Sequence, residues 1–165
     1  MNTILEDKEY KFKQLEKEIY RLVCDAGVVL TQKILEMKDQ KIFETVDKTQ
    51  YTSKGFRTTR IRTQYGNVSY ARRVYRTRPD DGKAAHVYLL DAALGMEKIG
   101  LISENLAEII ADAATEAPYR EAAAVVCDAT GNNISAQGAW NLMQSIGERI
   151  DDEETYDVNL MNANQ

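Results

Sequence analysis

The chain has 165 residues, of which 44% are hydrophobic, and it carries a net charge of −5, so it is long enough for one medium-sized domain or two small ones with a buried core. No apolar run approaches the roughly 18 residues of a membrane span, and the first residues do not resemble a secretion signal. Two distant cysteines, Cys24 and Cys127, and a single histidine, His86, exclude a recognisable zinc site and a disulfide framework. We therefore expect a cytoplasmic protein with reduced thiols, no metal and no cofactor.

Residues 1–48 are predicted to form a long charged helix. Their apolar residues recur at intervals of three and four, which is typical of one helical stripe: Phe12, Leu15, Ile19, Leu22, Ala26, Val29, Leu30, Ile34 and Met37. A helix of about 40 residues would be about 60 Å long, more than a small domain can cover alone. It is expected to break near Gly27, to pair with a second copy as a homodimer, or to pack on the chain's own core. The heptad spacing continues for fewer than three heptads, which is too short to decide between these alternatives.

The next segment, residues 49–90, is predicted to form a basic β-hairpin that extends into a three-stranded antiparallel meander. Lys48 to Arg78 contain nine basic residues and no acidic one, so the other 134 residues sum to −14. Such segregation of positive charge is typical of a surface that binds a polyanion. A solvated sheet face is the alternative, although solvated faces usually mix both signs of charge.

The hairpin is expected to turn at Gly66-Asn67, a pair that favours a two-residue turn, with Tyr65 opposite Val68. Side chains alternate between the faces of a strand, so the packed face is predicted to hold Thr59, Ile61, Thr63, Tyr65, Val68, Tyr70 and Val74. The other face is predicted to hold Arg60, Arg62, Gln64, Ser69 and Arg73. The remaining arginines, Arg57, Arg72 and Arg76, fall on the apolar side and are expected at its rim.

A turn at residues 79–82 is followed by a predicted third strand, residues 86–90. Its first residue, His86, is expected to face solvent, because no nucleophile or carboxylate can be assigned to it as a catalytic partner. We expect no independent enzyme activity: the acidic residues are predicted on helix surfaces, and the sequence contains no phosphate-binding loop and no nucleophile motif.

Residues 91–150 read as a helical region with a helix-turn-helix. A single turn ends at Gly95, Ser103 caps the next helix, and Pro118 separates it from a third. Gly131 is the expected stop of that third helix, and Ser135 the cap of the last one. The apolar faces are predicted to be Leu106, Ile109, Ile110 and Ala113; then Tyr119, Ala122, Ala123, Val126 and Cys127; then Ala136, Ala139, Trp140, Met143 and Ile146.

The last helix would present polar side chains on the face opposite its core, and Asn and Gln are suited to adenine edges in the major groove. The predicted residues for base readout are Ser135, Gln137, Asn141 and Gln144. Residues 103–150 have a net charge of −5, so the hairpin would have to supply the attraction to DNA. A plain core helix pair or a protein–protein surface remains an alternative for this helix. Residues 151–165 are expected to be an acidic, disordered tail.

The order of these segments resembles a known family. The matching motifs are Arg60–Val68 leading to Arg72-Arg73, Val87–Asp91 with Leu94-Gly95, Tyr119–Ala123, Thr130-Gly131, and Ile134-Ser135 ahead of Trp140-Asn141. Over about residues 5–150 the chain is similar to the N-terminal half of a bacterial insertion-sequence transposase family, long classed as an uncharacterised protein family. Pro118, where a small polar cap is expected, and the segment 158–162 depart from the pattern.

The resemblance implies a DNA-binding half that precedes a ribonuclease-H-like catalytic domain with an acidic metal-binding triad. That second half does not occur in this sequence, so a truncated copy or a fragment is expected. The predicted DNA-backbone contacts are Arg57, Arg60, Arg62, Arg72, Arg73, Arg76, Arg78 and Arg120. The alternatives are a helix-turn-helix transcription regulator and a helical dimerisation scaffold without a nucleic-acid partner; charge alone does not separate DNA from RNA.

Overall fold

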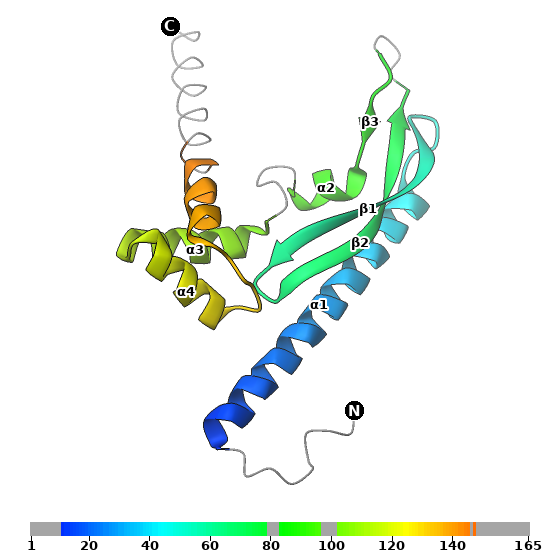
Figure 1. Ribbon diagram of the computed structural model, residues 1–165. Helices are drawn as coiled ribbons and strands as arrows, with labels where there is room; N and C mark the ends of the chain where they lie inside the picture. Colours follow the sequence, from blue (N-terminus) through cyan, green and yellow to red (C-terminus); the bar gives the residue numbers. More distant parts are fainter. Residues whose placement is uncertain (1–10, 79–82, 97–101, 146, 148–165) are drawn as a thin grey trace, which may run out of the picture.

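The computed structural model describes residues 11–78, 83–96, 102–145 and 147 and has an α+β fold that is mostly helical, as predicted (Figure 1). The predicted tail, residues 151–165, and the turn at residues 79–82 lie outside the described residues. The elements follow in the order α1 (Phe12–Thr45), β1 (Tyr51–Thr63), β2 (Gly66–Thr77), β3 (His86–Val87), α2 (Leu89–Leu94), α3 (Glu104–Glu116) and α4 (Tyr119–Ala129), with a last helix over residues 136–145. The three strands form one antiparallel sheet in the order β1-β2-β3.

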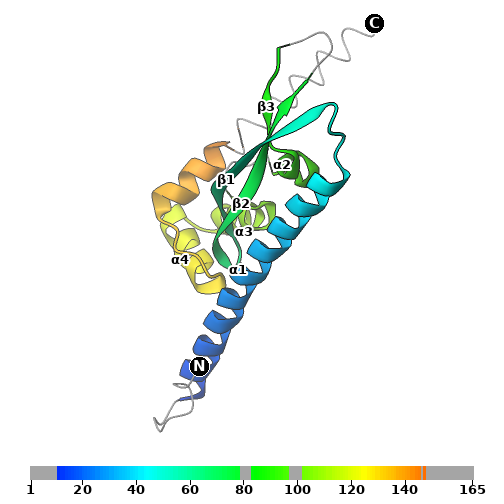
Figure 2. The same cartoon turned by 90° about the vertical axis from the view of Figure 1, so that its right-hand side faces the viewer.

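Helix α1 runs unbroken through 34 residues, a length of about 51 Å, and its N-terminal part projects beyond the other elements in both views (Figures 1 and 2). The expected break at Gly27 does not occur. A Cβ atom on Gly27 would lie 2.6 Å from Cγ of Tyr65, so the glycine allows the aromatic ring at the hairpin tip to pack directly on the helix backbone. None of the described helices combines the length and apolarity needed to cross a membrane.

The hairpin turns at Gln64 and Tyr65, two residues earlier than predicted. Thr63 pairs with Gly66 and Ile61 with Val68, so the predicted pairing of Tyr65 with Val68 is wrong. The hydroxyl of Thr63 closes the observed turn: it donates to the Gly66 carbonyl (3.1 Å) and accepts from the Tyr65 N–H (3.2 Å). The partner of Val68 moves by four residues, an even number, so the predicted alternation of faces survives the shift near the tip. Farther along β2 it does not hold, because Arg73, predicted on the open face, is mostly buried against Asp39 of α1.

One face of the sheet packs against α1 and α2. Its core joins Ile61, Val68 and Tyr70 to Leu35 of α1 and Leu90 of α2. The third strand is shorter than predicted and ends at Val87, because Leu90 is fully buried as part of α2 rather than of a strand. Helix α2 ends at Gly95, which has the positive φ (+64°) that favours glycine.

A second core lies between α3, α4 and residues 136–145. Its buried residues are Leu106, Ala107, Ile110, Val126, Ile134, Ala139 and Leu142. The two predicted serine caps are present: the Ser103 hydroxyl accepts from the Leu106 N–H (3.4 Å) and the Ser135 hydroxyl from the Gly138 N–H (3.1 Å). Trp140 was predicted in this core but is 44% exposed, since Ala139 and Leu142 turn the buried side of the last helix away from it.

Candidate nucleic-acid interface

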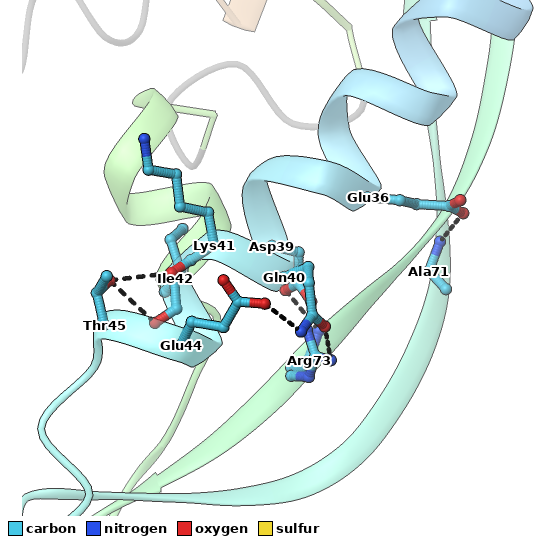
Figure 3. Close-up of polar contacts among 9 residues, drawn as sticks. All are labelled: Glu36, Asp39, Gln40, Lys41, Ile42, Glu44, Thr45, Ala71 and Arg73. Atoms are coloured by element: carbon cyan, nitrogen blue, oxygen red, sulfur yellow. Dashed lines mark hydrogen bonds and ion pairs between the residues drawn. The ribbon is translucent and has the colours of Figure 1, made fainter.

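Strand β3 pairs with β2 only at Tyr75 and Arg76, and helix α1 covers the neighbouring part of that edge, which β3 leaves unpaired. The backbone N–H of Ala71 donates to the Glu36 carboxylate (3.1 Å), and that of Arg73 donates to the Asp39 carboxylate (2.9 Å) (Figure 3). Unpaired strand edges invite pairing with other chains, and these two carboxylates take the place that a neighbouring strand would occupy. The acidic residues of α1 therefore fix the hairpin onto the helix.

Two of the nine cations of the hairpin are engaged inside the protein. The guanidinium of Arg73 pairs with Asp39 and donates to the Gln40 side chain (Figure 3). It also lies 4.3 Å and 4.6 Å from the ring centres of Phe43 and Phe56. Asp39 is only 1% exposed, so its charge depends on this partner. These contacts make Arg73 a structural residue.

The same holds for the neighbouring arginine. Arg72 pairs with Asp91 of α2, and its guanidinium lies 3.8 Å from the ring centre of Tyr88. Both members of the pair are mostly buried. The predicted contacts of Arg72 and Arg73 with the DNA backbone would have to compete with these ion pairs.

The other seven cations of the segment are exposed: Lys48, Lys54, Arg57, Arg60, Arg62, Arg76 and Arg78. Across the described ranges, the ion pairs are those of Arg72 and Arg73, and none involves these seven side chains. Arg60 lies opposite Ser69 and Arg62 opposite Asn67, and all four side chains are exposed. Arg60 and Arg62 form an open cationic face, opposite the face that α1 and α2 cover; by strand alternation Arg57 and Arg76 belong to the covered side, at its exposed rim.

The hairpin tip is held by the turn that follows α4. Gly131 N–H donates to the Gln64 carbonyl (3.0 Å), and the Asn132 side chain donates to the Thr63 carbonyl (2.6 Å). A Cβ atom on Gly131 would come within 2.1 Å of the Tyr65 carbonyl oxygen. The sequence around Gly131 indicated only a helix stop, because a contact across more than 60 residues leaves no local signal. The basic hairpin and the predicted helix-turn-helix are thus locked to each other.

The last helix exposes the amide side chains Gln137, Asn141 and Gln144. Gln137 donates to the Asn141 side chain (2.9 Å), so these two amides contact each other. Ser135 is exposed, but its hydroxyl accepts the capping hydrogen bond from Gly138, which makes it a structural cap. Arg120 is exposed on α4.

The surface of α3 and α4 has the opposite charge. Its exposed acidic residues are Glu104, Glu108, Asp112, Glu116, Glu121 and Asp128. A polyanion would be repelled by these carboxylates. Compared with α3 and α4, the hairpin is the more favourable side for its approach.

A cavity of about 770 Å³ lies between the N-terminal half of α1 and the end of α4. The Tyr20 hydroxyl at its wall donates to the Ala129 carbonyl (2.6 Å), and partial burial, together with the neighbouring Cys24 thiol, raises the pKa of that phenol. The lining contains both signs of charge, including Glu16, Lys17, Arg21, Asp25 and Asp128, so it offers no single-sign site for an anion. Within the described part of the chain, no three His, Cys, Asp or Glu side chains cluster as metal ligands would.

Comparison with known proteins identifies one family. Its profile, described as Uncharacterised protein family (UPF0236), matches residues 5–160, about ten residues beyond the segment inferred from the motifs. No curated protein and no solved structure matches the chain. Because the profile covers nearly the whole sequence, the chain belongs to the uncharacterised protein family UPF0236.

Proposed function

We propose that this chain is a double-stranded DNA-binding module. The observation that carries the proposal is the hairpin with seven exposed cations, none of which has a carboxylate partner among the described residues. Solvated surfaces usually interleave both charges, whereas α3 and α4 carry six acidic residues against one basic residue, Arg120. Positive charge on one element and negative charge on another orient the molecule toward a polyanion.

The two parts of the site have different tasks. The exposed arginines of the hairpin, Arg57, Arg60, Arg62, Arg76 and Arg78, contact phosphates and supply affinity without sequence preference. The helix over residues 136–145 presents Gln137, Asn141 and Gln144 to base edges, where amides pair with adenine. The bonds from Gly131 and Asn132 to the hairpin tip keep the two parts in one fixed arrangement.

The finer assignment is a module resembling the N-terminal half of an insertion-sequence transposase. Its support is the combination of motifs quoted above, from Arg60–Val68 to Trp140-Asn141. The target would then be the end of a mobile element, and strand cutting and joining would belong to a ribonuclease-H-like domain outside this sequence. A transcription regulator of the same architecture would instead prefer a promoter.

The proposal is tested by titrating the protein into labelled random and element-end duplexes over a series of salt concentrations. If the five exposed arginines each contact a phosphate, the logarithm of the affinity falls with the logarithm of the salt concentration at a slope of about −4.5. The double variant R60Q/R62Q should lower the magnitude of that slope by about 2. The matched control is Lys38→Gln, which removes one exposed cation from α1 and should leave the slope unchanged.

Three results would refute DNA binding through the hairpin: affinity that ignores salt, equal losses in R60Q/R62Q and Lys38→Gln, or no binding to any duplex. A preference for duplex RNA of the same sequence would transfer the proposal to RNA, where shape and 2′-hydroxyl contacts dominate.

A further inference from the structure

Helix α1 has two apolar sides, and the sheet uses only one of them. The side that faces the sheet and the hairpin tip holds Cys24, Val28, Leu35 and the buried Asp39. The stripe predicted from the sequence is the other side. It is not covered by any described element, and its large side chains are each at least half exposed: Phe12, Ile19, Leu22, Val23, Val29, Leu30, Ile34 and Met37.

These eight residues form one continuous band. At 100° per residue they fall within about 140° of the helix circumference, together with Leu15 and Ala26. The band runs along most of α1, including the part that projects beyond the other elements (Figures 1 and 2). A helix that only packed on its own domain would place polar residues here.

The size of the band indicates a protein interface. Eight half-exposed side chains present on the order of 800 Å², which is about the area that each partner contributes to a standard interface. Soluble monomers rarely expose a contiguous apolar patch of this size. Covering it would remove an apolar stripe from water along the length of α1.

We propose that α1 is a homodimerisation helix and that a second copy of this chain covers the band. Charge favours an identical partner: α1 contains six basic and six acidic residues, so two copies do not repel each other. Between Phe12 and Met37 the band contains two charged residues of opposite sign, Glu16 at its border and Lys33 inside it, and it can be buried in a symmetric, isologous contact. A membrane-surface helix would instead carry a polar face dominated by Lys and Arg.

This dimer does not depend on DNA binding. The band faces away from the sheet, so the partner helix can lie along α1 without displacing β1, β2 or α2. Each dimer would carry two cationic hairpins. The test therefore measures association of the protein alone.

The experiment measures the mass of the full chain in solution by sedimentation equilibrium and light scattering. The wild-type chain should be a dimer at micromolar concentration, and I19E/L30E should be a monomer, with a dissociation constant raised at least ~100-fold because buried carboxylates are costly. Glu is a good helix former and both positions are exposed, so circular dichroism should stay unchanged. The matched control is Gln14→Glu, an exposed position off the band, which should remain a dimer.

A cysteine at Ala26, an exposed position within the band, provides a second measurement. Ala26→Cys should form a disulfide-linked dimer under mild oxidation, judged against the wild-type chain with its own Cys24 and Cys127. A monomeric wild type overturns the proposal, as does an I19E/L30E variant that stays dimeric. Undefined aggregates overturn it too, and so does a monomer that sediments with anionic phosphatidylserine vesicles, which would assign the band to a membrane surface.

Discussion

A single methyl group added at Gly131 should separate the hairpin tip from the turn after α4. In Gly131→Ala the new Cβ would lie 2.1 Å from the Tyr65 carbonyl oxygen and 3.2 Å from Cβ of Cys24. The first distance is shorter than an ordinary contact distance by more than ~1 Å. One of the two atoms is a backbone atom and the other is bonded to the backbone, so neither can move away by a side-chain rotation. The hairpin tip and the turn after α4 must therefore move apart.

The cost can be estimated from what this movement breaks. Overpacking of this kind costs about 1–3 kcal/mol, and the hydrogen bonds from Gly131 to Gln64 (3.0 Å) and from Asn132 to Thr63 (2.6 Å) are lost or lengthened, at about 1 kcal/mol each. We expect a loss of about 3 kcal/mol in the free energy of unfolding. In urea, with a slope of about 2 kcal/mol per molar, the midpoint should fall by about 1.5 M.

Gly138→Ala is the matched control. Its Cβ would meet the Ser135 hydroxyl oxygen at 3.4 Å, an ordinary contact, and Gly138 lies within the last helix, where alanine is favoured by about 0.5–1 kcal/mol. Equal midpoints for the two variants, or a Gly131→Ala chain as stable as wild type, would refute the contact between the hairpin tip and the turn after α4.

Three further predictions concern buried charge, alkaline pH and base readout. Asp39→Ala should destabilise the fold by about 3–5 kcal/mol in urea denaturation, because it leaves the Arg73 guanidinium without its carboxylate. Burial raises the pKa of the Tyr70 phenol, with the Arg72 guanidinium acting in the opposite direction. The contribution of Tyr70 to stability is therefore complete below pH ~10 and is lost as the pH rises toward the pKa of the folded state. Tyr70→Phe should reduce that alkaline loss in pH-dependent melting. Replacing Gln137 and Asn141 with Ala should cost about 1–3 kcal/mol of discrimination at adenine positions in competition binding and leave the salt slope unchanged.

Each of these has its own control. Asp25→Ala removes an exposed carboxylate from the same helix. A similar loss of stability in this variant would show that the ion pair of Asp39 with Arg73 is not the cause of the destabilisation. An alkaline melting curve that Tyr70→Phe does not change would assign the loss to other groups, among them Tyr75, whose pKa burial and the Asp39 carboxylate also raise. If the amide variants weaken binding to all duplexes equally, the last helix does not read bases.

Local chemistry was enough to place most of the helices and their ends. Ser103 and Ser135 could be recognised as caps, because a hydroxyl before an apolar periodic run accepts hydrogen bonds from N–H groups of the first turn of its own helix. Gly95 could be recognised as a stop, because glycine favours the positive φ that ends a helix and this preference is local. The alternation of Arg60, Ile61 and Arg62 likewise survives any even shift in pairing. The register itself did not follow from Gly66-Asn67, because the position of the turn is set by Gly131, Asn132 and Thr63 around the Tyr65 backbone.

The amino-acid order by itself determined that α1 is amphipathic, that the hairpin is cationic and that four short helical segments follow. It could not determine which arginines remain available to a ligand. Arg72 and Arg73 form ion pairs with Asp91 and Asp39, and these carboxylates belong to other elements of the chain. Nor could it determine which side of α1 packs, because both sides contain apolar residues and only the position of the sheet selects Leu35 over Leu30. Periodicity and capping depend on neighbours along the chain, whereas pairing and burial depend on segments that meet only after folding.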